Sequence, residues 1–191
     1  MKIAKVTALF LAGAVALAAK DKPETRWMVP VCMELTPSDS GLAIMKKAQI
    51  AAAAMFGEIG VRLVWHHPGS CPAGALRISL SYHTPADFHP GALAYASPYE
   101  GTHIVVFWDR VRVRVRESLL AAFTAHIVAH EITHVLQGVS HHSTTGLMKA
   151  YWGASDLATM ATMPLPFTAD DIDLIQRGML RREGLAAAGE R

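Results

Sequence analysis

The sequence lacks several features that define common protein classes. It has only two cysteines in 191 residues, too few for a disulfide scaffold or a four-thiolate zinc site. Charged residues make up 18% of the chain and apolar residues 51%, so the chain is too hydrophobic to be disordered and can bury a core. It contains no repeat at a fixed period and no phosphate-loop or dinucleotide motif. At this length we expect one compact domain.

The first residues have the composition of an export signal. Two lysines precede a 14-residue apolar run, Val6 to Ala19, which is shorter than the roughly 20 residues that span a bilayer. Small residues at Ala16 and Ala18 suit a signal peptidase. We therefore expect residues 1–18 to be a signal peptide and residues 19–191 to be a single domain. The processed protein is expected to be exported, either secreted or periplasmic, with no stable insertion in a membrane.

Signal removal changes the charge balance. The whole chain has 18 basic and 16 acidic residues, and loss of the two signal lysines leaves 16 of each sign. A chain of near-zero net charge is not expected to bind nucleic acid. Export also favours a disulfide between Cys32 and Cys71, because the compartment is oxidising. The alternative is a free Cys32 thiolate that blocks a metal.

The periodicity of apolar residues predicts an α+β chain. A strand, a helix and several further strands precede a long helix over residues 118–137, and Thr168 is expected to cap a C-terminal helix. An apolar stripe from Met45 to Ile59 indicates the first helix. The predicted strands are residues 27–34, 61–65, 76–81, 92–96 and 103–108.

Residues 110–116 alternate arginine with valine. At a period of two, the valines would line one face of an extended segment and the arginines the other. One interpretation is a strip that grips an anionic substrate or surface. The other is a half-buried strand or extended connector with its arginines in solvent, and we favour this second interpretation.

The long helix carries the motif His130-Glu131-Ile132-Thr133-His134. Residues four apart lie one above the other on a helix, so His130 and His134 can occupy adjacent corners of a zinc tetrahedron. Glu131 lies about 100° around the helix, where it can reach water on the metal. An isolated glutamate in an apolar helix lowers the stability of the fold, so we expect Glu131 to be there for a function. The motif predicts one catalytic Zn²⁺, with Glu131 as general base.

The remaining ligand is expected from outside this helix. His126 lies one turn before His130, but a third ligand from the same helix would force an awkward geometry on the metal, so we expect a supporting or core histidine. The adjacent His141 and His142 follow the end of the helix at Gly138. Asp156 is the fallback ligand if both histidines fail. His66 and His67 have no ligand spacing and are expected at the surface.

The stretch from His130 to Met148 resembles the metzincin zinc endopeptidases, the matrixins in particular. Their pattern is His-Glu-x-x-His-x-x-Gly-x-x-His, followed by a turn that holds a methionine beneath the metal. In this sequence the glycine comes one residue late. His141 keeps the Gly-x-x-His spacing, whereas His142 keeps the His-Ser-Thr run into Gly-Leu-Met. The turn chemistry favours His142, with His141 as the alternative. Met148 is similar to the methionine of that turn, with an ordinary core methionine as the alternative.

The resemblance implies a metzincin-like zincin domain: a twisted mixed sheet packed on a long active-site helix, with a C-terminal helix. It also implies a secreted zinc-dependent endopeptidase that hydrolyses peptide bonds with a zinc-activated water. Residues 92–96 would be an edge strand to which a peptide or protein substrate adds by backbone hydrogen bonds. The alternatives are a secreted zinc-binding or interaction protein without turnover and a zinc hydrolase of a non-peptide substrate. The intact Glu131 favours an enzyme.

Overall fold

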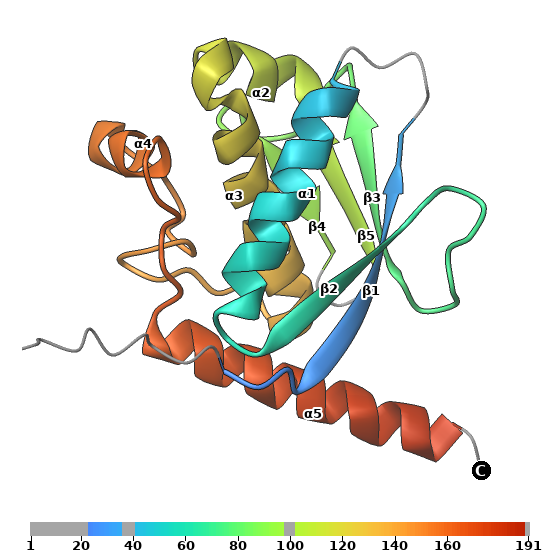
Figure 1. Ribbon diagram of the computed structural model, residues 1–191. Helices are drawn as coiled ribbons and strands as arrows, with labels where there is room; N and C mark the ends of the chain where they lie inside the picture. The colour runs from blue at the N-terminus through green and yellow to red at the C-terminus, as the bar shows by residue number, and fades with distance from the viewer. Residues whose placement is uncertain (1–22, 36–40, 98–101, 190–191) are drawn as a thin grey trace, which may run out of the picture.

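The computed structural model describes residues 23–35, 41–97 and 102–189 (Figure 1). The predicted signal peptide, residues 1–18, lies outside these ranges. The strands are β1 (Trp27–Glu34), β2 (Val61–His66), β3 (Leu76–Ser81), β4 (Ala94–Ala96) and β5 (His103–Phe107). The helices are α1 (Leu42–Gly57), α2 (Trp108–Arg114), α3 (Glu117–Gln137), α4 (Ala154–Met160) and α5 (Ala169–Gly189).

The five strands form one mixed sheet in the order β2-β1-β3-β5-β4. Strands β2, β1, β3 and β5 are parallel, and β4 runs antiparallel to β5 at one edge. Figure 1 shows the twisted sheet with α1 and α3 side by side against it, while α5 crosses below them. This arrangement confirms the predicted order of strand, helix and further strands, and gives a mixed α/β architecture.

Helix α3 is the centre of the core. By length and composition it could cross a bilayer, but 78% of its apolar window is buried inside the protein, so it is a core helix. It ends at Gly138, whose φ of 67° places it in the left-handed region that closes a helix at low cost for glycine. The predicted helix over residues 118–137 is therefore confirmed to within one residue at its start.

Helix α5 holds the C-terminal end of α3. The last carbonyl groups of a helix lack partners within it. Arg181 donates to the carbonyl oxygen of Gln137, and Arg182 donates to that of Val135 at 2.9 Å. A Cβ atom on Gly178 would overlap the Leu136 carbonyl, so the glycine permits this close approach. The turn of α3 that carries His134 is thus fixed by a second helix.

The prediction of a strand or connector over residues 110–116 is wrong, because residues 108–114 form helix α2. Trp108 and Val111, three residues apart, are buried, whereas Val113 is 76% exposed. The alternation is also compatible with a helix, because alternate members of the pattern, such as Arg110 and Arg114, lie four residues apart and share one face of a helix. Arginine also favours helices more than strands. The chain becomes extended only at Val115, where φ is −135° and ψ is 161°.

Three strand boundaries also differ from the prediction, and the first of these is the end of β2, at His66 rather than at residue 65. Strand β4 begins at Ala94 rather than at residue 92, and the Ala92 carbonyl instead accepts a hydrogen bond from Arg110 at 3.0 Å. Strand β5 ends at Phe107 because Trp108 begins α2. The start of β4 thus depends on a contact between two segments that are distant in sequence.

Candidate metal centre

Three histidines converge beside the sheet edge. His130 and His134 come from α3, and His142 comes from the loop that follows it; one ring nitrogen of each lies within 4.8 Å of the others. The two Nε2 atoms of His130 and His134 are 3.0 Å apart. In a tetrahedral zinc site with Zn–N bonds of about 2.0–2.1 Å, ligating nitrogens lie roughly 3.3 Å apart. The donor set and its spacing therefore fit one zinc ion.

The loop after α3 orients His130. Its Nδ1 donates to the Leu147 carbonyl oxygen at 3.1 Å, which leaves the Nε2 lone pair facing the other two histidines. The Leu147 amide in turn donates to the Pro166 carbonyl at 2.9 Å. Gly146, with φ of 73°, allows this turn, and a Cβ atom there would overlap the Pro166 carbonyl oxygen. One imidazole tautomer is thus held in place by the backbone.

The same loop contains the predicted methionine. Met148 is fully buried, and its carbonyl accepts a 2.8 Å hydrogen bond from the Ser143 amide, next to His142. The Ser143 hydroxyl donates to Asp171 of α5 at 2.6 Å. Asp171, itself fully buried, also accepts from the Thr168 amide at 2.8 Å and so caps α5. The start of α5 therefore holds the segment that carries His142.

The sequence predicted Thr168 as the cap of this helix but did not predict a wider role for Asp171. Its contact with Ser143 joins two segments 28 residues apart, which local patterns do not reveal. The spacing of Thr168 and Asp171 as a capping pair was visible, and the structure has both of its hydrogen bonds. The buried position of such a pair was the missing signal.

His126 stands outside the histidine cluster. Its Nδ1 donates to the Ala122 carbonyl at 2.7 Å, and its Nε2 accepts from the Leu165 amide at 3.0 Å. Both nitrogens are therefore used by the protein, and the side chain is 1% exposed. Burial lowers its pKa and keeps the ring neutral. This is the environment of a core histidine that ties the Leu165 segment to α3.

The other two ligand candidates also lie outside the cluster of three. His141 is not part of it. Asp156 accepts hydrogen bonds from Lys149 at 2.6 Å and from the Gly153 amide at 2.8 Å, so its carboxylate is used to close the start of α4. The Lys149 ammonium lowers the pKa of Asp156.

The electrostatics of the centre favour metal binding over protonation. Burial lowers the pKa of His130 to about 4 and that of His134 to about 3, so both rings are neutral donors at neutral pH. Burial, although of lesser extent, also lowers the pKa of His142. Burial raises the pKa of Glu131 to about 8, and a cation beside it would oppose that rise. In each of these side chains, the charged form is costly unless an oppositely charged partner lies beside it.

The centre opens into a cleft of about 340 Å³. Residues 91–96, which include β4, form one wall, α3 lies along the cleft with Glu131, and residues 149–152 line the opposite side. The apolar part of the lining comes from Leu93, Phe123, Ile127, Trp152 and Leu157. The Trp152 ring lies 5.5 Å from that of His130. The cleft is therefore mostly apolar, and its charged residues besides the histidines are Glu131, Arg114 and Lys149.

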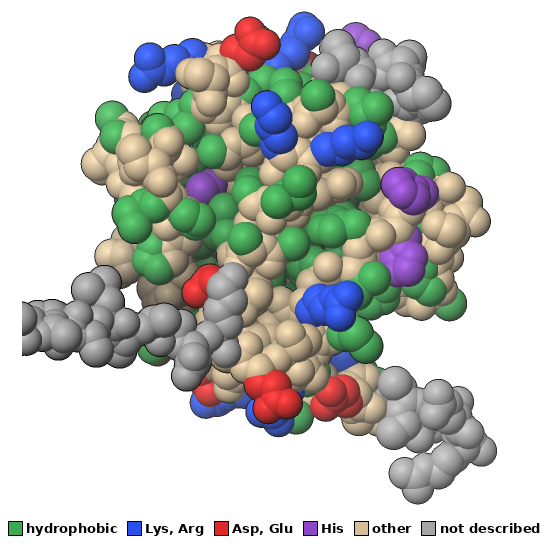
Figure 2. Space-filling view, in the orientation of Figure 1, with side chains coloured by type: hydrophobic (Ala, Val, Ile, Leu, Met, Phe, Trp, Pro, Cys, Tyr) green, Lys and Arg blue, Asp and Glu red, His purple; other side chains and the backbone are tan. Residues whose placement is uncertain are grey.

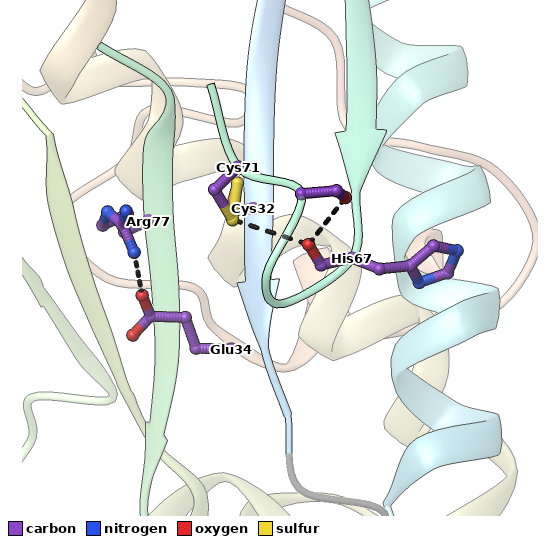
Figure 3. Close-up of a disulfide and its surroundings, with 6 residues drawn as sticks. Cys32, Glu34, His67, Cys71 and Arg77 are labelled. Carbon is purple, nitrogen blue, oxygen red and sulfur yellow. Dashed lines mark hydrogen bonds and ion pairs between the residues drawn. A yellow bond between two sulfur atoms is a disulfide. The ribbon is translucent and has the colours of Figure 1, made fainter. Parts of the chain in front are cut away.

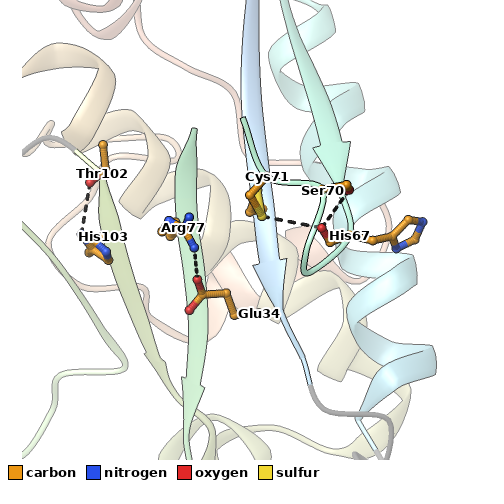
Figure 4. A network of polar contacts seen from close by, with 8 residues as sticks. Glu34, His67, Ser70, Cys71, Arg77, Thr102 and His103 are labelled. Carbon is orange, nitrogen blue, oxygen red and sulfur yellow. Dashed lines mark hydrogen bonds and ion pairs between the residues drawn. A yellow bond between two sulfur atoms is a disulfide. The ribbon is translucent and has the colours of Figure 1, made fainter. Parts of the chain in front are cut away.

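The two cysteines lie elsewhere in the fold. Cys32 of β1 and Cys71 of the loop between β2 and β3 form a disulfide (Figure 3), so Cys32 is not a free thiolate that could block a metal. The His67 ring points away from this disulfide, and His103 lies on the far side of Arg77 (Figure 4). Within the part of the chain that the structure describes, only the His130, His134 and His142 group has metal-ligand spacing.

No protein-family model matches this chain, and no curated protein is significantly similar to it in sequence. Its fold is similar to that of an archaemetzincin from Methanopyrus kandleri, with a TM-score of 0.53 and 14% sequence identity. The match covers 81% of this chain and 96% of the archaemetzincin chain. At this identity the similarity concerns the fold alone. The matrixin-like features rest on the motif from His130 to Met148.

Proposed function

We propose that the protein is a zinc-dependent endopeptidase whose metal is held by His130, His134 and His142. The observation that carries this proposal is the convergence of three imidazoles beside Glu131, a half-buried glutamate in an open cleft. A zinc ion held by these three histidines would supply Lewis acidity for the activation of water and the polarisation of a carbonyl group. The similarity of the fold to an archaemetzincin supports the same class of protein.

Glu131 is the general base of the proposed reaction. It lies one residue from His130 and lines the cleft, so its carboxylate is open to a substrate bound there. It takes the proton of the attacking water and delivers it to the nitrogen of the leaving amine. Its burial keeps the carboxylate poorly hydrated, which strengthens it as a base. A protein that only stores zinc has no need of such a group.

Strand β4 would position the substrate. Among the residues that the structure describes, it pairs only with β5, so its other edge has no strand partner there, and residues 91–96 line the cleft. An extended peptide can add to such an edge by backbone hydrogen bonds, which bind many sequences equally well. The substrate is thus proposed to be a peptide or protein segment in extended conformation.

Export is part of the proposal. The apolar N-terminal run motivates it, and the Cys32–Cys71 disulfide supports it, because disulfides persist in oxidising compartments. Mass spectrometry of the protein recovered from its source tests this point. Mature chains that begin at Ala19 are expected, and an intact N-terminus inside the cytoplasm would contradict it.

Peptide-library cleavage by the zinc-loaded protein tests the proposed activity. The Glu131→Gln variant should lose about 10²–10⁴-fold in rate while it retains its zinc. Glu117→Gln is the matched control, because Glu117 is exposed in the first turn of the same helix. Cleavage that survives Glu131→Gln would contradict the proposed base. Zinc binding without cleavage of any peptide would instead favour a binding protein or a non-peptide substrate.

A further inference from the structure

Lys and Arg side chains are visible at the end of the molecule where α2 lies (Figure 2). The three arginines within α2 itself have different environments. Arg110 donates to the carbonyl oxygens of His89 and Ala92 at 2.7 and 3.0 Å, so it clamps the loop that leads into β4. Arg112 is exposed and does not line the cleft. Arg114, four residues after Arg110 and therefore on the same side of the helix, lines the cleft beside the histidines.

Arg114 contacts the opposite side of the cleft. Its guanidinium donates to the Tyr151 hydroxyl at 3.3 Å, and its central carbon lies 5.9 Å from the centre of the Tyr151 ring. Tyr151 directly precedes Trp152, which packs against His130. A phenol 67% exposed thus holds a cation in the same cleft as the candidate metal centre.

No described residue compensates the charge of Arg114. The other cation of the cleft, Lys149, is paired with Asp156 at 2.6 Å. Glu131 is the only carboxylate among the described residues that line the cleft, and it belongs to the metal centre. Among the residues that the structure describes, no carboxylate pairs with Arg114. Its partner is a neutral hydroxyl, which occupies one of five guanidinium donors.

We propose that Arg114 and Tyr151 form a subsite that binds a carboxylate of the peptide substrate. A guanidinium presents two parallel donors that match a carboxylate, and the Tyr151 hydroxyl adds a third donor beside them. The carboxylate belongs either to an Asp or Glu side chain or to the free C-terminus of the peptide. This inference rests on the proposed peptidase function and names its substrate class.

Two peptide series distinguish the sources of the carboxylate. In one, each position in turn carries Glu or Gln; in the other, the C-terminus is a free acid or an amide. For the wild-type protein, kcat/KM is expected to be about tenfold higher for the carboxylate member of one series. Arg114→Gln should remove this preference, and Arg114→Glu should shift it toward a Lys-containing peptide. Arg112→Gln, a change of the same kind on the same helix, should keep the wild-type preference.

Binding to the zinc-loaded Glu131→Gln variant, measured by fluorescence anisotropy, separates this inference from the peptidase proposal. A preference for the carboxylate peptide that depends on Arg114 supports the subsite even if no peptide is cleaved. Cleavage or binding without a carboxylate preference, or with a preference unchanged in Arg114→Gln, overturns the subsite and leaves the peptidase proposal standing. Failure of the wild-type protein both to bind and to cleave any of these peptides overturns both.

Discussion

The histidine cleft and the disulfide end of the sheet both contain polar side chains, but these side chains have different environments in the two regions. At the disulfide end, defined by Cys32, Glu34, His67, Cys71 and Arg77, the two charged side chains are partly exposed and paired with each other (Figures 3 and 4). Arg77 and Glu34 form a 2.6 Å ion pair with side chains about 40% exposed. In the cleft, His130 and His134 are 8% exposed, and their Nε2 atoms face one another.

This difference favours the histidine cleft as the region with a function beyond folding. Exposed ion pairs contribute little to the free energy of unfolding, and their groups already have partners, so they do not indicate a ligand site. In the cleft, burial lowers the pKa values of the histidines and raises that of Glu131. A bound cation would compensate for this burial, because neutral imidazoles can ligate it and a carboxylate can lie beside it. Changes at the disulfide end should therefore alter stability alone, whereas changes in the cleft should alter ligand binding.

The largest expected effect on stability comes from Gly146→Ala. Gly146 has a φ of 73°, and an added Cβ atom would meet the Pro166 carbonyl oxygen. We expect the free energy of unfolding to fall by about 3–5 kcal/mol, from left-handed strain and overlap together. Gly74→Ala at the disulfide end, where φ is 75° but no atom lies within 4 Å, should cost only about 1–2 kcal/mol. Urea unfolding measures both, and equal losses would contradict the crowded turn.

Removal of the disulfide should reduce stability and spare the metal centre. The Cys32→Ala, Cys71→Ala double variant opens a loop of 39 residues, and we expect a loss of about 3 kcal/mol. Zinc affinity should remain that of the wild-type protein, because none of the three histidines contacts this region. A parallel loss of zinc affinity in protein that is still folded would show that the two regions are coupled.

The pH dependence of unfolding reports on Glu131. Its pKa of about 8 in the folded protein lies above the ordinary value of 4.5, so the metal-free protein loses stability as the pH rises from 4.5 through 8. Relative to wild type, Glu131→Gln should gain on the order of 2 kcal/mol at pH 9 and nothing below pH 4.5, since cleft water screens part of the burial. Glu117→Gln should show no such pH-dependent gain. A flat difference across this range would contradict the buried carboxylate.

The smallest effect is expected from the exposed ion pair at the disulfide end. Glu34→Gln removes the partner of Arg77, whose side chain is 42% exposed. Because solvent and salt screen such pairs, thermal unfolding should report a loss of less than about 1 kcal/mol. A larger loss would mean that this end of the sheet is more than a scaffold.

The features that were predictable from the sequence are those set by local spacing. A four-residue interval on a helix places His130 beside His134 whatever surrounds them, and Gly138 marks the helix end in any context. The strands were likewise visible as short apolar runs, except where a distant side chain sets a boundary. Arg110, for example, holds the Ala92 carbonyl and so shortens β4.

The features that could not be predicted depend on contacts between distant segments. The extra residue before Gly138 left His141 open as the alternative to His142, and the loop held by Asp171 places His142 beside the two histidines of α3. Helix α2 forms because Trp108 and Val111 are buried in the core, which the alternation of arginine and valine does not show. Only with α2 in place does Arg114 reach the cleft.

Zinc titration of the purified metal-free protein tests the central claim most directly, with wild type, His142→Ala and the matched His141→Ala compared side by side. Wild type and His141→Ala are expected to bind one zinc with equal affinity. His142→Ala should bind it more weakly, on the order of a hundredfold, because one of three protein ligands is lost. Equal affinity in His142→Ala and wild type, or a loss confined to His141→Ala, would contradict the site described by the three converging imidazoles.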